Sequence, residues 1–269
     1  FTAQDRVEEF KLDTPADISP PYAASLAQAV TPVAPQPLEL IMLGASNGFD
    51  PANPCSNMVL GSNGRYVLVD AGPYVRTTLR AAGVGTSQLG ALIITHAHED
   101  HIGALGHLWP KLKKKIYARR FTATIGRLKF DEYGLPQDAI TVVEPRPAVV
   151  EAGPFKVQFV PISHSVPECS SLIIDTPAGR ILHTGDFKLD ETPIVGEGWD
   201  PGLFAMIAAE APIKALMCDS TNVFSPLPGR SEATLADPLH GLIGGAGGMV
   251  VATTFASNVA RLKTLAEAG

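Results

Sequence analysis

Short apolar runs, separated by turns rich in glycine and polar residues, dominate the pattern of hydrophobic positions from Leu38 onward. Runs of about four to eight such residues are typical of β-strands, and apolar residues at helical spacing occupy fewer stretches. Strands and helices that mix along a chain indicate an α/β protein with packed sheets. The pattern predicts strands at 38–43, 57–60, 66–70, 91–95, 115–118, 140–143, 155–162, 171–175, 180–184 and 249–253, and helices at 74–82, 121–130, 232–242 and 258–268.

The part of the chain before Leu38 differs in composition and in its pattern of apolar residues. Residues 14–37 contain six prolines and show no regular apolar period. Proline supplies no backbone N–H and interrupts both helices and sheets. We therefore expect residues 1–37 to form an N-terminal arm or linker.

Composition narrows the class of protein. The 269 residues are 45% hydrophobic and 18% charged, a globular balance that excludes disorder along the whole chain. No apolar run approaches the roughly 18 to 20 residues of a membrane span, so we expect no membrane association. The net charge of −6 argues against a uniformly basic surface but not against a local basic groove. Three scattered cysteines cannot form a disulfide scaffold and suit a reducing cytoplasm, where we expect the protein to reside.

The segment THAHEDH, from Thr95 to His101, places three histidines and an aspartate directly after an apolar strand. His96 and His98 are two residues apart, so both side chains point the same way from an extended strand end. Asp100 and His101 follow where the chain turns and can face a second centre close by. Neutral imidazoles and a carboxylate are ligands that zinc prefers. These four residues are therefore predicted metal ligands.

Residues at other strand ends can complete a binuclear site. His164 and Asp186 each follow an apolar strand, and a carboxylate after a Thr-Gly turn is suited to bridge two metals. We predict both as ligands. Asp70 also ends a strand, and it either caps that strand or orients a ligand histidine through the second ring nitrogen. His183 either hydrogen-bonds within its own loop or acts on the reaction, and Cys169 fits a small buried hydrophobe better than a ligand.

The spacing HxHxDH, formed here by His96, His98, Asp100 and His101, resembles the mark of the metallo-β-lactamase superfamily. Further segments, which run from about residue 91 to the end of the chain, together resemble ribonuclease J, a β-CASP nuclease of bacteria and archaea. They are 95–105 (THAHEDHIGAL), 161–168 (PISHSVPE), 183–189 (HTGDFKL), 218–222 (CDSTN) and 254–262 (TFASNVARL).

The resemblance implies an α/β fold in two parts. A metallo-β-lactamase αββα sandwich would span 38–222, and the start of an α/β β-CASP domain would occupy 223–269. The sequence departs from the family in three places. Residues 44–58 read GASNGFDPANPCSNM instead of the family's glycine loop, the stretch from Asp70 to His96 is shorter, and the HxSGHA-like motif with a further metal-binding histidine does not occur.

The resemblance also implies an activity. The expected enzyme is a zinc-dependent hydrolase that cleaves single-stranded RNA, as an exonuclease, an endonuclease or both, with a metal-bound hydroxide as attacking group. Manganese and magnesium stay open as supplements to zinc. Two zinc ions are implied, the first held by His96, His98 and His164, the second by Asp100 and His101, with Asp186 between them.

Catalytic and substrate-contacting roles are predicted for a small set of residues. Asp100 and Asp186 act at the metals, and His183 is the candidate that steers the reacting groups. Ser220, with Asp219, matches the first β-CASP motif and is expected to contact the substrate.

A cluster of basic residues lies between 111 and 129. Lys113, Lys114 and Arg119 within it can form a surface that follows RNA phosphates. The same run is better explained as a solvated helix face or strand entry.

Two other functions remain open. A hydrolase of small carbonyl substrates, such as lactones or β-lactams, would use the same metal cluster, although segments 218–222 and 254–262 disfavour it. A non-catalytic, metal-stabilised module that binds RNA or a protein is the third interpretation. The sequence does not distinguish a monomer from a homo-oligomer.

Overall fold

A six-stranded sheet forms the first layer of the computed structural model, which describes residues 36–46, 54–227 and 229–269. Its strands follow one another in chain order, antiparallel from β1 to β3 and parallel from β3 to β6. They are β1 (Glu39–Gly44), β2 (Asn57–Ser62), β3 (Arg65–Val69), β4 (Leu89–Ile93), β5 (Ile116–Ala118) and β6 (Ile140–Val142).

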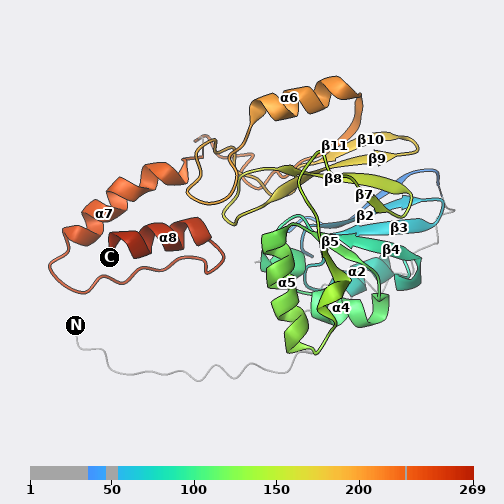
Figure 1. Cartoon of the computed structure of the whole chain (residues 1–269), viewed down its shortest axis with the longest axis horizontal. Coiled ribbons are helices and arrows are strands. Elements are labelled where there is room, and N and C mark those ends of the chain that lie inside the picture. The colour runs from blue at the N-terminus through green and yellow to red at the C-terminus, as the bar shows by residue number, and fades with distance from the viewer. Residues whose placement is uncertain (1–35, 47–53, 228) are drawn as a thin grey trace.

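A five-stranded sheet lies face to face with the first (Figure 1). Its order is β11-β10-β9-β8-β7, antiparallel except for the parallel pair β10 and β11. Alternation along β8 turns Phe155, Val157 and Phe159 toward the first sheet, where they pack with Met58 and Ile93. The strands are β7 (Val150–Ala152), β8 (Phe155–Pro161), β9 (Ser170–Thr176), β10 (Gly179–His183) and β11 (Ile213–Met217).

Helices cover the outer faces of both sheets. Leu79, Leu108 and Phe130 of three helices pack on the first sheet, and Ile207 of a fourth packs on Leu182 of the second. This arrangement confirms the predicted αββα sandwich. The helices are α2 (Val75–Ala81), α4 (Leu105–Leu112) and α5 (Arg120–Glu132) on the first sheet and α6 (Pro201–Glu210) on the second, with short turns α3 (Glu99–Ile102), η1 (Thr86–Gln88) and η2 (Gln137–Ala139) between them.

The segment after β11 lies to one side of the sandwich (Figure 1). It contains η3 (Glu232–Leu235), α7 (Ala236–Gly244) and α8 (Val259–Ala268). The strand predicted at 249–253 is wrong, because this stretch pairs with no strand in the described part of the chain. Its side chains are left in solvent, with Met249 94% and Val251 80% exposed.

The predicted arm at 1–37 lies outside the described residues except for its last two positions. Among the described residues, no helix is long and apolar enough to cross a membrane.

The sandwich brings the loops that carry the predicted ligands to one end. The residues after β3 and β4 leave the same edge of the sheet because these two strands are parallel. The loops after β8 and β10 reach that end from the second sheet, and their side chains contact those of the β4 loop. The fold therefore places residues about 70, 96–101, 164 and 186 side by side.

Removal of a large side chain between the sheets is expected to destabilise the protein. Phe159 is fully buried, so Phe159→Ala leaves a cavity and should lower the free energy of unfolding by about 3–5 kcal/mol in urea titrations. Leu128→Ala is the matched control, because Leu128 is 56% exposed on α5 and should change stability by about 0.5 kcal/mol or less. Equal losses in the two variants would contradict the packing described here.

Candidate metal centre

One group of side chains that could hold a metal consists of His96, His98, His164 and Asp186. One donor atom from each lies within 4.8 Å of the others. His96 Nε2 faces His98 Nδ1 at 3.1 Å, and it lies 3.8 Å from the Asp186 carboxylate. His164 Nε2 is buried and has no hydrogen-bond partner among the described residues. Buried ring nitrogens without partners are costly unless a ligand satisfies them.

A second group consists of Asp100, His101 and Asp186. His101 Nε2 lies 3.6 Å from Asp100 Oδ2 and 3.4 Å from Asp186 Oδ2, and it too is buried without a hydrogen-bond partner in the described chain. Asp186 belongs to both groups, as a bridging carboxylate would. Imidazole nitrogens with carboxylate oxygens form a donor set that fits divalent metals such as zinc.

Asp70 connects the two strand ends beneath these groups. It is almost fully buried, and its carboxylate accepts hydrogen bonds from the Thr95 N–H (2.8 Å) and the Thr95 hydroxyl (2.9 Å). The same carboxylate lies 2.8 Å from His101 Nδ1, which is the contact that orienting a histidine requires. His101 Nε2 is thereby turned toward Asp100 and Asp186.

A close backbone contact fixes the turn that holds Asp100 and His101. The Ala71 N–H donates to the His101 carbonyl, and the Ala104 N–H donates to the Ala71 carbonyl. A Cβ atom at Gly72 would lie 1.9 Å from the Asp100 carbonyl oxygen, so only glycine permits this approach. These contacts join the loop after β3 directly to the loop after β4.

Burial and neighbouring charges separate the histidines into two classes. Burial, followed by the charges of nearby histidines, lowers the pKa of His98 to about 4 and holds that of His96 well below its usual value. Burial also lowers the pKa of His164. Burial acts against charge on His101 as well, but the carboxylates of Asp70 and Asp186 outweigh it and raise the pKa of His101 well above 6.5.

The pKa of Asp186 falls to about 2, because its contacts with protonated His101 and other histidines outweigh the opposing effect of burial. At neutral pH the shared residue is therefore a carboxylate flanked by three neutral imidazoles and one charged imidazole. Metal ligands must be deprotonated, so the three neutral imidazoles and the carboxylate are ready to bind, whereas His101 must first lose a proton.

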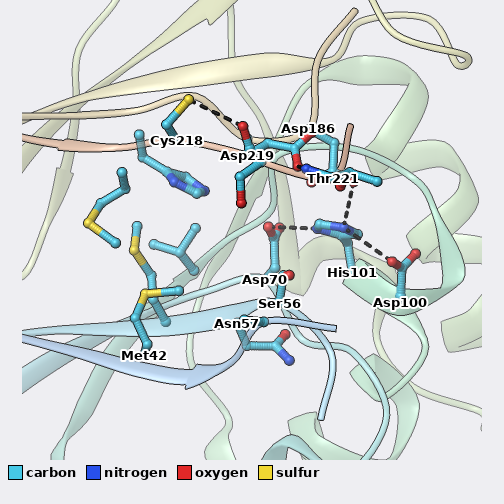
Figure 2. A pocket seen from close by; sticks show the side chains of 17 residues that line it. Met42, Ser56, Asn57, Asp70, Asp100, His101, Asp186, Cys218, Asp219 and Thr221 are labelled. Carbon is cyan, nitrogen blue, oxygen red and sulfur yellow. Dashed lines mark hydrogen bonds and ion pairs between the residues drawn. The ribbon is translucent and has the colours of Figure 1, made fainter. Parts of the chain in front are cut away.

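A cavity of about 270 Å³ opens beside the second group (Figure 2). Asp100, His101 and Asp186 line it on one side and Met42 lies on the other (Figure 2), and Met58 and Met217 are also among its lining residues. His183 also lines it, with a buried Nδ1 that has no hydrogen-bond partner in the described part of the chain.

Ser220 and Asp219 are among the residues that line this cavity, as a substrate-contacting role for Ser220 would need. The Asp219 carboxylate accepts hydrogen bonds from the Thr221 N–H and hydroxyl, which shapes the turn.

The structure does not bring the predicted basic residues to the cavity. Lys113 and Lys114 precede β5, whereas the histidines follow the parallel strand β4, so they occupy opposite ends of the sheet. Arg119 lies at the correct end but is only 6% exposed, and its guanidinium donates to Glu197. A phosphate-contacting surface made of these three residues does not fit this arrangement.

Sequence reasoning missed two residues that touch the predicted ligands. Ser165 Oγ lies 2.9 Å from His98 Nε2, and so holds that ring with Nδ1 turned toward His96. The Thr95 hydroxyl lies 3.1 Å from His96 Nδ1. Their positions directly beside His164 and His96 in the chain are the signal that could have indicated both.

Comparisons with known proteins show the family to which the fold belongs. The model of the family described as metallo-beta-lactamase superfamily matches residues 50–233. The chain is 42% identical to ribonuclease J of Sinorhizobium meliloti over 67% of its own length and 32% of that protein. It is 34% identical to ribonuclease J of Mycolicibacterium smegmatis over 88% of its length and 43% of that protein. The chain thus spans less than half the length of these curated relatives.

Solved structures share the fold at low sequence identity. The Zn(2+)-bound PqqB structure from Methylobacterium extorquens has a TM-score of 0.54 at 16% identity and covers 74% of this chain and 85% of that one. A protein of unknown function from Enterococcus faecalis has a TM-score of 0.56 at 17% identity, and the match covers 80% of this chain and 60% of that one. These likenesses extend to the fold alone.

Asp70→Asn is expected to weaken metal binding. The amide keeps the size of the side chain but removes the charge that orients His101, so zinc affinity should fall by roughly 10- to 100-fold in chelator competition. Asp237→Asn, an exposed position on α7, is the matched control and should bind zinc as the unmodified chain does. Unchanged affinity in Asp70→Asn would refute the orienting role.

Proton release on metal binding should report the two classes of histidine. His96, His98 and His164 are neutral at pH 7 and have no proton to lose, whereas His101 must deprotonate at Nε2. The ligand side chains should therefore release about one proton on full loading, a bound water that ionises to hydroxide adds one more, and apparent affinity for the second group should rise with pH. Calorimetric titrations in buffers of different ionisation enthalpy measure the count. Release of four or more protons would show that the three histidines of the first group are charged before binding.

Proposed function

Because the chain belongs to the metallo-β-lactamase superfamily, we propose that it is a metal-dependent ribonuclease that hydrolyses single-stranded RNA. One observation carries this proposal: two groups of candidate metal ligands lie beside the cavity, and Asp186 belongs to both. Binuclear sites of this kind suit in-line displacement at phosphorus. The relatives named ribonuclease J favour RNA as the substrate.

The residues present fit two divalent ions, which we propose to be zinc, with manganese or magnesium as supplements. His96, His98 and His164 would hold the first ion, Asp100 and His101 the second, and Asp186 both. When bound, the ions supply Lewis-acid activation of water and neutralise charge on the phosphodiester.

The protein's own residues then supply orientation. Asp70 holds His101, and Ser165 holds His98, so that neither ring can rotate away from its position. His183 and Ser220 line the cavity where a phosphodiester would lie, and we propose that they steer it. The sandwich at 38–222 would carry this chemistry, and residues 223–269 would begin a β-CASP region. The three free cysteines favour the cytoplasm as location.

A hydrolase of small carbonyl substrates is the second candidate. The methionine side chains among the cavity's lining residues favour it, because a small apolar acyl group could pack against them beside the ligand groups. Turnover of lactones or β-lactams without cleavage of RNA would replace the first proposal by this one.

The test of ribonuclease activity uses the 269-residue chain loaded with zinc and manganese. We expect it to degrade 5′-monophosphorylated, end-labelled single-stranded RNA. The Asp100→Ala/His101→Ala double variant should lose this activity, because it removes two of the three donors of one group. Glu267→Gln, on the exposed side of α8, should retain it.

Metal content is measured in the same samples. A fully metal-loaded chain that leaves the RNA intact would overturn the proposal, as would cleavage that the double variant retains.

A further inference from the structure

Glu232 is the first residue of η3, and its carboxylate is nearly buried. Two cations from distant parts of the chain contact it. Lys188 Nζ lies 2.9 Å from Oε1, and Arg261 Nη2 lies 3.1 Å from Oε2, with Arg261 Nε at 3.2 Å. The Glu232 side chain is only 9% exposed. Lys188 lies in the loop after β10, and Arg261 lies in α8. The Glu232 carboxylate therefore joins the sandwich to the segment beside it.

Backbone and side-chain hydrogen bonds hold the same junction. The buried Asp190 carboxylate accepts the N–H groups of Glu232 and Thr192, each at 3.0 Å. The Ser231 hydroxyl donates to the Thr192 carbonyl at 3.1 Å. Residues 231–232 are therefore fastened to residues 190–192 at several points.

The junction continues to both loops that carry predicted metal ligands. The Lys188 N–H donates to the Ser163 carbonyl at 2.8 Å, and the Asp190 N–H reaches the Ser163 hydroxyl at 3.1 Å. The Ser163 hydroxyl in turn donates to the Lys188 carbonyl. Ser163 directly precedes His164, and Lys188 comes two residues after Asp186. The spacing of these two ligands thus depends on the position of the Lys188 backbone.

Glu232 is the shared partner of two cations near that position. Its carboxylate is only 9% exposed, while the Lys188 and Arg261 side chains are 27% and 32% exposed, so removing the Glu232 charge leaves two partly buried cations without their common partner. The pair Lys263–Glu267 on α8 is different, since both side chains are about half exposed and 3.9 Å apart. An exposed pair of this kind contributes little.

We propose that Glu232 is a positioning residue for metal binding. Its carboxylate holds Lys188 and Arg261, and it thereby fixes the position of the loop after β10, which carries Asp186. The inference rests on the proposed function only in taking the His and Asp groups as metal sites. Residues outside the sandwich thereby control the geometry of the centre inside it.

The experiment compares Glu232→Gln with Glu267→Gln in the 269-residue chain. Zinc affinity is measured by chelator competition well below the unfolding temperature, and hydrogen exchange is measured by mass spectrometry on the metal-free protein. Glu232→Gln should lower zinc affinity by roughly tenfold and speed exchange at residues 186–192. Glu267→Gln should change neither.

Arg261→Gln serves as a second variant, in case Glu232→Gln does not fold. It removes one cation but leaves the Lys188 contact, so it should show the same local exchange with a smaller loss of affinity. The proposal is overturned if zinc affinity and exchange at 186–192 stay as in the unmodified chain. It is also overturned if a variant only lowers the unfolding temperature or speeds exchange throughout the molecule.

These outcomes are separable from those of the proposed function. A chain that binds zinc but leaves RNA intact loses the ribonuclease proposal, while zinc affinity still decides the role of Glu232. Without any zinc binding by the unmodified chain, the metal-binding role of Glu232 falls together with the site.

Discussion

The buried carboxylate of Asp70 is the interaction on which the rest of the centre depends. A charged group with almost no exposed surface is tolerated only when its oxygens are satisfied, and here Thr95 and His101 satisfy them. The partners come from the loop after the neighbouring parallel strand, so the carboxylate fixes the distance between two strand ends. That contact turns His101 Nε2 toward Asp186, and together the Asp70 and Asp186 carboxylates raise the pKa of His101.

Sequence reasoning predicted the parts of the structure that local pattern determines. Alternation along 155–161 identifies a strand with one face in the core, and the structure has β8 there. The candidate ligands of the β4 loop stand out in the sequence because they are close in the chain. His164 and Asp186 needed a different inference, that polar residues at the ends of apolar strands gather at one edge, and the structure places them beside the β4 loop.

Other features depend on tertiary context that the sequence does not carry. Helix α6, PGLFAMIAAE, is apolar on nearly every side, so its sequence has no helical period and we did not predict it. Residues 249–253 resemble a strand in composition, yet nothing described lies beside them to pair with. The burial of Arg119 depends on Glu197, 78 residues further along the chain, and no local signal indicates such a contact.

Asp186 lies within reach of both donor groups, and this has a thermodynamic consequence. If each group holds an ion, one carboxylate takes part in two binding equilibria, which are therefore linked. Linkage requires that an ion in either position change the affinity of the other position by the same factor, whichever is filled first. Affinity at this centre is then a property of the pair of positions, and a single dissociation constant for either one has meaning only when the occupancy of the other is stated.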